Sequence, residues 1–485
     1  MATFLIGLVV LFVGAAIYGK FCEKVFGPDD RETPAYSKQD GVDYVPMREW
    51  KNSLINLLNI AGTGPIIGPI QGILFGPIAF ITIPIGNVIG GAMHDYFSGM
   101  ISLRHKGENL PEILGRYLGS QAQWISRAAC IVFSVLVGVV FAVGPAAILA
   151  PMTGWSVSTW VWIIFGYYFL ATILPIQAIM GRVYPLFSVA LIIMVAGILG
   201  VMLLMPFAES MPYWMHIPRM EVLPDMDFFH NLHPADFPLF PVMFITIACG
   251  AISGFHATQS PMMARCMKNE KLGRRVFYGA MITEGVVALI WAAAAIKFAG
   301  SYEALAELMS PSGKSNPAIV VNAICQDWMG TAGAVLAILG VVAAPVTSGD
   351  TAFRCARLIA SDFLHYRQDT ILRRLIISLP LFVIAAVLMN INFDILWRYF
   401  AWFNQTLSIF TLWAVTVWLA RKGKTFYVTL FPALFMTAVC TTYILVAPEG
   451  FGLSYVLSCA VGGGVAVLLF GMFMKWYLQF KKTRV

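Results

Sequence analysis

Long apolar runs, separated by short polar stretches, follow one another along almost the whole chain. A helix that crosses a membrane needs about 20 mainly apolar residues, because the hydrocarbon layer is about 30 Å thick and a helix rises about 1.5 Å per residue. Runs of this kind predict thirteen membrane-spanning helices. They cover residues 3–19, 53–75, 77–101, 123–151, 155–175, 184–206, 239–262, 277–300, 331–350, 372–390, 394–419, 425–446 and 452–474.

The composition agrees with this pattern and narrows the class of protein. Of the 485 residues, 59% are hydrophobic and 12% are charged, whereas soluble domains have roughly 45–50% apolar and about 25% charged residues. A soluble enzyme and a disordered chain are both excluded. The eight cysteines are scattered singly, without the spacing of a zinc site or a disulfide framework. We therefore predict an all-α polytopic membrane protein.

The positive charges indicate how the chain crosses the membrane. If the C-terminus is cytoplasmic and the N-terminus is outside, the inner stretches hold 28 of the 32 Lys and Arg residues, as the positive-inside rule requires. The excess of positive charge then reports topology, and no nucleic-acid partner is expected. The first run lacks a basic leader, so we interpret it as a retained helix. The inner stretches are 20–52, 102–127, 176–183, 263–276, 354–374, 421–424 and 475–485.

Two of the runs are interrupted near their middle by residues that break helices. In the run 53–75, three glycines and two prolines fall between positions 62 and 69, and the run 239–262 has a similarly small and polar centre. Broken helices at membrane depth are tolerated where protein buries them or where they line a wet cavity. For either run alone, a kinked and tightly packed helix is the alternative interpretation.

The interrupted runs are the second and the seventh, so they cross the membrane in opposite directions. Five-helix units that begin at these runs predict an inverted repeat, which many secondary transporters have, with binding where the helices break. The predicted division is an N-terminal helix and cytoplasmic loop (1–52), a first repeat (53–206), an extracytoplasmic loop (207–238), a second repeat (239–420), and two C-terminal helices with a basic tail (421–485).

Four motifs in the chain resemble the carbon starvation protein A family. They are residues 59–72 (NIAGTGPIIGPIQG), 91–95 (GAMHD), 247–256 (IACGAISGFH) and 347–354 (TSGDTAFR). The resemblance implies bacterial inner-membrane uptake of peptides or of pyruvate. It also implies the amino acid–polyamine–organocation superfamily, with its leucine-transporter-type fold of five plus five helices.

Ionisable residues within the predicted spans are candidates for ion coupling, because charged groups inside a membrane are costly. Proton coupling through a buried histidine or carboxylate is one interpretation. A metal site of His94, Asp95 and His256 is a second, although adjacent residues share a helix face poorly. Structural ion pairs are a third, such as Asp350 with Arg354 on one helix face. The candidates are His94, Asp95, His256, Glu284 and Asp350, which all fall in the predicted inner half.

Two hydroxyl residues, Thr347 and Ser348, offer a different coupling site. Their resemblance to sodium-coupled members of the superfamily implies that they face carbonyls near residues 62–65 and hold Na⁺, a hard cation that prefers oxygen ligands. The alternative is that both hydroxyls bond carbonyls of their own helix.

We expect the substrate to bind at the two helix breaks, where the free N–H groups of a half-helix favour a carboxylate. The candidate residues are Asn59, Gly62, Thr63, Gly64, Gly68, Gln71, Gly250, Ser253 and Gly254. Gln177, Asn404 and Gln405 are further polar candidates, which helix–helix hydrogen bonds explain equally well.

The combined prediction is a secondary-active importer of small carboxylate-bearing nutrients, peptides or pyruvate, coupled to H⁺ or Na⁺ and without a resident cofactor. The sequence contains no Walker A, HExxH or GxSxG motif, which argues against an ATP-driven pump and against an intramembrane enzyme. A nutrient-sensing receptor built on a transporter fold is the alternative from a different class. The sequence leaves the oligomeric state open.

Overall fold

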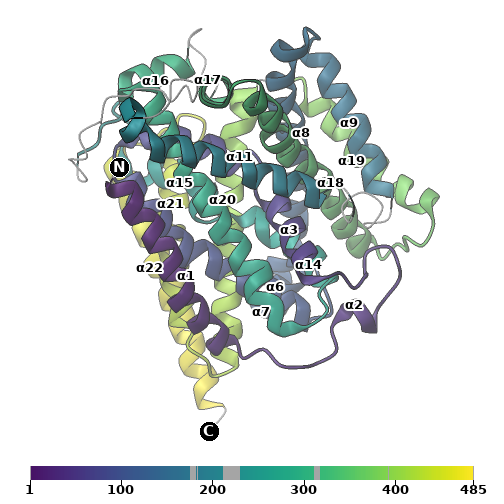
Figure 1. Ribbon diagram of the computed structural model, residues 1–485. Coiled ribbons are helices and arrows are strands. Elements are labelled where there is room, and N and C mark those ends of the chain that lie inside the picture. The colour runs from purple at the N-terminus through teal and green to yellow at the C-terminus, as the bar shows by residue number, and fades with distance from the viewer. Residues whose placement is uncertain are drawn as a thin grey trace.

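The computed structural model describes residues 2–174, 182, 184–210, 230–310, 317–391 and 393–483. In these ranges the chain forms helices joined by turns and loops, which confirms the predicted all-α fold. The helices pack side by side in one bundle (Figure 1). The described α-helices longer than four residues are α1 (Ala2–Phe26), α3 (Glu49–Ile60), α4 (Gly64–Gly72), α5 (Ala79–Gly86), α6 (Ala92–Arg104), α7 (Leu110–Leu118), α8 (Ser120–Thr153), α9 (Val157–Ile173), α11 (Tyr184–Leu204), α14 (Gly254–Ala264), α15 (Gly279–Ala299), α16 (Tyr302–Met309), α17 (Ala318–Ala337), α18 (Ala343–Leu364), α19 (Ile371–Leu388), α20 (Phe393–Arg421), α21 (Tyr427–Val446) and α22 (Tyr455–Lys482).

In the described part of the chain, eight helices are long and apolar enough to cross a membrane, or nine if the bent pair α3–α4 counts as one span. These nine coincide with nine of the predicted runs. The other four predicted runs are also helical, but as short or interrupted segments; α9, for example, has 17 residues. The total of thirteen spans therefore stays a prediction.

The first broken helix consists of α3 and α4, whose axes are bent by 49°. Residues 61–63 separate them, and Pro65 stands in the first turn of α4, where its missing N–H costs no hydrogen bond. The second broken helix consists of the short helices α12 (Phe244–Thr246) and α13 (Ala248–Ala251) followed by α14. Its backbone is extended at Ile252 and Ser253. Both breaks predicted from the sequence are thus confirmed.

Glycines bring the two broken helices into direct contact. A Cβ atom on Gly68 would lie 2.6 Å from the carbonyl oxygen of Thr246, and one on Gly64 would lie 2.5 Å from Cβ of Cys249. Small residues allow helix backbones to approach this closely in a membrane, where packing replaces the hydrophobic effect between helices. The glycines near the breaks therefore set the distance between α4 and the α12–α13 segment.

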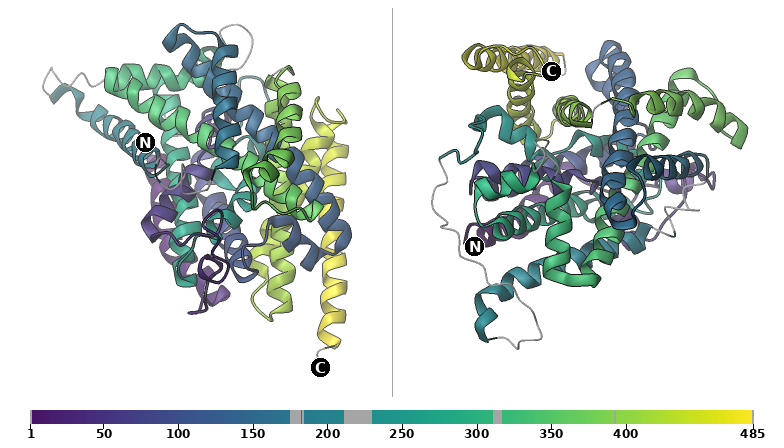
Figure 2. Two further views of the ribbon diagram at one scale, coloured as in Figure 1. Left: turned by 90° about the vertical axis from the view of Figure 1, so that its right-hand side faces the viewer. Right: turned by 90° about the horizontal axis from the view of Figure 1, so that it is seen from above.

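The basic stretches predicted to lie inside meet at one end of the bundle. Ion pairs join Glu23 to Arg274 at 2.8 Å, Lys271 to Asp30 at 2.5 Å, and Arg104 to Glu270 at 2.6 Å. The start of α1 and the end of α22 lie toward opposite ends of the bundle, and α22 ends at the side where α2 (Pro34–Ser37) lies (Figure 1, Figure 2). An odd number of crossings is consistent with this arrangement.

The ninth predicted run ends at Asp350, but the helix that contains this residue, α18, continues to Leu364. The apolar run ends where Asp350 begins a polar face, while the helix continues because that face is buried by neighbouring helices. Asp350 is therefore a buried residue in the body of α18, and not a residue at a helix end.

Candidate functional site

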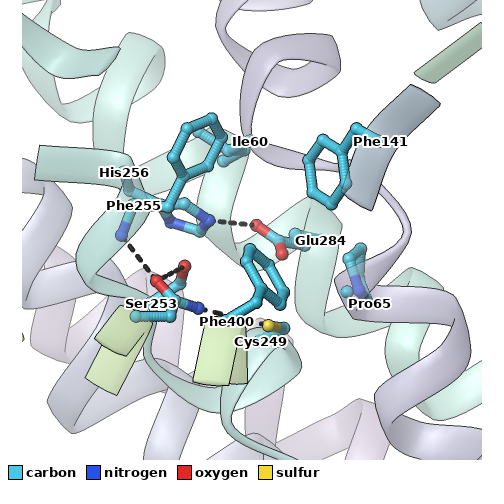
Figure 3. A pocket seen from close by; sticks show the side chains of 11 residues that line it. Ile60, Pro65, Phe141, Cys249, Ser253, Phe255, His256, Glu284 and Phe400 are labelled. Carbon is cyan, nitrogen blue, oxygen red and sulfur yellow. Dashed lines mark hydrogen bonds and ion pairs between the residues drawn. The ribbon is translucent and has the colours of Figure 1, made fainter. Parts of the chain in front are cut away.

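A small cavity lies where the two broken helices are interrupted (Figure 3). Its wall combines the end of α3, the start of α4 and the start of α14 with side chains from α8, α15 and α20. The rings of Phe141, Phe255 and Phe400 make much of the wall apolar, and a few polar groups face the interior. The lining residues are Ile60, Gly64, Pro65, Phe141, Cys249, Ser253, Phe255, His256, Glu284, Phe400 and Asn404.

Asn404 of α20 organises the start of α14. Its side-chain oxygen accepts hydrogen bonds from the backbone N–H of Phe255 (2.7 Å) and from the hydroxyl of Ser253 (3.1 Å). Its amide nitrogen donates to the sulfur of Cys249 at 3.3 Å. The oxygen thus satisfies an N–H group that has no partner within its own helix. The side-chain oxygen of Asn404 therefore lies at the start of α14, where the free N–H groups of a helix attract an anion.

His256 connects the cavity to a buried polar chain. Its Nδ1 lies 2.7 Å from one carboxylate oxygen of Asp95, and Nδ1 of His94 lies 2.9 Å from the other. On the cavity side, Nε2 of His256 lies 3.4 Å from Glu284 (Figure 3). All four side chains are at most 2% exposed. Four of the five ionisable candidates therefore converge, from the separate helices α6, α14 and α15.

Asp350, the fifth candidate, belongs to a different cluster. Its Oδ2 accepts hydrogen bonds from the hydroxyls of Tyr167 (2.8 Å) and Tyr184. The suggested pairing of Asp350 with Arg354 is not what the structure contains: Arg354 ion-pairs with Asp43 at 3.4 Å. The two tyrosines come from α9 and α11, so no spacing in the sequence could have indicated them.

The hydroxyls of Thr347 and Ser348 bond mainly within α18. Both donate to the carbonyl oxygen of Ala344 at 2.9 Å, as the alternative interpretation stated. The hydroxyl of Ser348 is also within hydrogen-bond distance, 3.1 Å, of the carbonyl oxygen of Leu58, about one turn before the break between α3 and α4. The expected approach of α18 to the first broken helix is thus present, but at Leu58 and not at residues 62–65.

The predicted substrate residues fall into three groups. Gly64 and Ser253 line the cavity. Asn59 and Thr63 are buried beside the first break, and their side-chain polar atoms have no hydrogen-bond partner among the described residues. The others serve packing or lie farther away: a Cβ atom on Gly62, Gly68, Gly250 or Gly254 would collide with a neighbouring helix, and Gln71 is partly exposed. Their part in binding stays a prediction.

Sequence reasoning missed the aromatic lining and underrated Asn404. The chain has 35 phenylalanines, so nothing in the sequence marked those at positions 141, 255 and 400. Gln405 is fully buried and both its polar atoms lack a partner in the described chain. Gln177 lies outside the described residues. Among the described residues, no group of three or more His, Cys, Asp or Glu has a geometry that would hold a metal ion.

The role of Asn404 gives a testable expectation. Asn404→Ala leaves the N–H of Phe255 and the hydroxyl of Ser253 buried without their acceptor, and an unsatisfied buried group costs about 1–3 kcal/mol. We expect the melting temperature of the detergent-solubilised protein, followed by tryptophan fluorescence, to fall by several degrees. Asn390→Ala is the matched control, because Asn390 is exposed and its side chain donates to carbonyl oxygens near the end of α19. Equal melting temperatures for the two variants would contradict the role given to Asn404.

Sequence comparison adds the family to this geometry. The profile of the carbon starvation protein CstA family matches residues 1–146 and 142–325. The chain belongs to this family. The resemblance predicted from the four motifs is thereby confirmed.

Several relatives of this CstA-family protein are known by sequence. An uncharacterized membrane protein of Haemophilus influenzae is 42% identical over 350 residues, which are 64% of this chain and 94% of that protein. The peptide transporter CstA of Escherichia coli is 26% identical over 66% of this chain and 54% of its own length. The peptide transporter CstA of Helicobacter pylori is 28% identical over 57% of this chain and 48% of its own. This chain thus matches about half the length of the named peptide transporters.

Solved structures share the fold at low sequence identity. Mhp1, a nucleobase-cation-symport-1 family transporter, superposes with a TM-score of 0.52 at 13% identity, over 90% of this chain and 95% of its own. A manganese transporter of Eremococcus coleocola superposes with a TM-score of 0.50 at 14% identity, over 92% of this chain and 99% of its own. The two CstA proteins and the two solved structures described above are transporters by name, in agreement with the prediction of a transporter and not an enzyme.

Proposed function

We propose that this protein is a secondary-active importer of small carboxylate-bearing nutrients, with peptides as the first candidate substrate and pyruvate as the second. The name of the relatives supports peptides, and the shared transporter fold supports alternating access around a central site. The proposed location is a bacterial inner membrane, with thirteen spans, the N-terminus outside and the C-terminus in the cytoplasm. The proposed core is a five-plus-five inverted repeat that begins at the two broken helices.

The observation that carries the proposal is the cavity at the two helix breaks, with His256 and Glu284 in its wall. The half-helices α4 and α14 both start there, and helix starts attract the carboxylate that peptides and pyruvate share. The apolar rings opposite suit a small organic side chain or methyl group. A substrate carboxylate would replace the oxygen of Asn404 as the acceptor at the start of α14.

Proton coupling follows from the charges in this wall. A second carboxylate that enters beside a buried glutamate is repelled unless one of the two takes up a proton. The chain Glu284–His256–Asp95–His94 offers sites for that proton and a route away from the cavity. The substrate and one proton are thus expected to bind together. Sodium coupling is the second candidate, favoured by the contact of Ser348 with the carbonyl of Leu58.

Uptake by the purified protein in liposomes tests the proposal and separates the two ions. We expect a labelled dipeptide to accumulate when the outside is made acidic, without a requirement for Na⁺. In that case, the double variant Thr347→Ala with Ser348→Ala keeps its uptake. Uptake that requires Na⁺ and is lost in the double variant would assign coupling to α18 instead. Absence of flux for both the dipeptide and pyruvate under either gradient would overturn the proposed function.

A further inference from the structure

Four arginines gather at the end of the bundle that carries Asp43. Arg265 follows α14, Arg354 and Arg357 lie on α18, and Arg374 lies on α19. Each is at most 5% exposed. Buried charges are costly unless they are paired, so this concentration of positive charge requires an explanation.

Most of the hydrogen bonds that these arginines make go to neutral groups. Arg265 donates to the carbonyl oxygen of Gly107 (2.9 Å) and to the amide oxygen of Asn109 (3.0 Å). Arg354 donates to the carbonyl oxygens of Ala171 (2.6 Å) and Leu174 (2.9 Å). Such acceptors fix the guanidinium groups in place without cancelling their charge.

Arg357 has the clearest unused capacity for a ligand. It is fully buried and donates through one nitrogen to Gln368. Its Nε and Nη2, and Nε of Arg354, have no hydrogen-bond partner among the described residues. A guanidinium group presents parallel N–H donors that match the two oxygens of a carboxylate.

Asp43 is the carboxylate that occupies this region in the structure. Its Oδ1 accepts a long hydrogen bond from Nη1 of Arg354 at 3.4 Å and lies 3.9 Å from Nη2 of Arg357. Burial alone would raise the pKa of Asp43, but the four arginines hold it below its ordinary value. Asp362 also lies near the cluster and accepts a hydrogen bond from the amide nitrogen of Asn109. The cluster therefore has more positive than negative charge.

The segment that carries Asp43 crosses the ends of the helices that line the cavity. The backbone N–H of Met47 donates to the carbonyl of Cys266 at 3.0 Å, and the ring of Tyr44 lies under the guanidinium of Arg265. Helix α14 starts at the cavity and ends at this segment, and α18 carries Arg354 and Arg357 one and two turns beyond Asp350. In the same stretch of α18, the thiol of Cys355 donates to the carbonyl oxygen of Thr258 in α14 at 3.1 Å.

We propose that the arginine cluster is a second carboxylate-binding site, between the cavity and this end of the bundle, and that Asp43 occupies it while the path is closed. When the path opens, Asp43 leaves, and the carboxylate of the departing substrate takes its place beside Arg354 and Arg357. The inference rests on the proposed transport of carboxylate-bearing nutrients. It adds a release site and assigns the segment 38–48 as the part that closes it.

The test measures how often α14 and α18 separate. In a variant that retains Cys355 alone among the cysteines, the rate of reaction of this buried thiol with a membrane-impermeant maleimide reports opening in detergent solution. We expect Asp43→Asn to increase the rate about tenfold, which corresponds to loss of one modest ion pair. In the parent, millimolar formate, a free carboxylate that competes with Asp43 for the arginines, is expected to raise the rate, whereas chloride at equal ionic strength is not.

Two further variants keep the test decisive. Asp43→Glu retains the charge and is expected to react at the parent rate. Glu49→Gln removes an exposed ion pair with Arg275 at the same end and is also expected to leave the rate unchanged. A parent-like rate in Asp43→Asn with an unchanged melting temperature, or equal effects of formate and chloride, would overturn the inference. Labelling needs no transport, so these results are independent of whether liposome uptake supports the proposed function.

Discussion

Glu284→Gln is expected to abolish uptake driven by a pH gradient while exchange of substrate across the membrane continues. The substitution keeps the shape of the side chain but removes its ability to gain and lose a proton. Glu284 lies in the cavity wall and faces His256. Because glutamine has nearly the same shape, the cavity is expected to stay formed. Loss of one coupled proton removes about 2.3 kcal/mol per 100 mV of driving force, which is about 50-fold in accumulation.

The measurement compares two modes of transport in the same liposomes. Net uptake of labelled dipeptide under a pH gradient should fall to the level of passive equilibration. Counterflow, in which unlabelled substrate inside exchanges for labelled substrate outside, should remain. Glu303→Gln is the control, because Glu303 is exposed on α16 and is not among the residues that line the cavity. Gradient-driven accumulation that survives in Glu284→Gln would exclude this residue as the coupling group.

Gly254→Ala is expected to have the second largest effect, on both stability and transport. A Cβ atom at this position would lie 2.2 Å from the carbonyl oxygen of Asn404 and 2.4 Å from the backbone nitrogen of Ser408. Backbone atoms cannot rotate away as a side-chain end can, so α14 and α20 must move apart. Overpacking of this kind costs about 1–3 kcal/mol. It also displaces Ser253 and His256, which adjoin Gly254 in the cavity wall.

Thermal melting and dipeptide uptake check this expectation together. Gly254→Ala should melt several degrees below the parent protein and lose most of its uptake. Gly463→Ala is the matched control, since a Cβ atom there would have no heavy atom within 4 Å. In that helix interior, alanine is favoured over glycine by about 1 kcal/mol, so its melting temperature should stay the same or rise. Parent-like behaviour of Gly254→Ala would mean that α20 yields easily at this contact.

The breaks in the two helices illustrate what could be predicted locally. Glycine and proline act on the backbone of the residues beside them, so the interruption at residues 61–63 could be inferred from the run 53–75 alone. The end of α18 could not be inferred in this way. Its polar face after Asp350 resembles a loop, and it remains helical because Arg354 and Arg357 find partners on other segments.

For the ionisable candidates too, one part could be predicted from the sequence and another part required the structure. The sequence identifies His94, Asp95, His256 and Glu284 as costly residues inside apolar runs, which made them candidates before any contact was known. The sequence also predicts that Asp350 lies in the same inner half of the membrane as these four residues. Which residues share a cluster depends on which helix faces meet, and the structure separates Asp350, bound by two tyrosines, from the other four.

The sequence by itself determined that the chain is a helical membrane protein of the CstA family with two broken helices. Apolar length, the distribution of Lys and Arg and the helix-breaking residues are properties of single segments, and they act whatever the neighbours are. Only the tertiary structure decided that aromatic rings close the cavity, that Asn404 caps α14, and that Asp43 reaches the buried arginines. These contacts join residues far apart in the chain, and their existence depends on how helices pack at close range, which no single segment specifies.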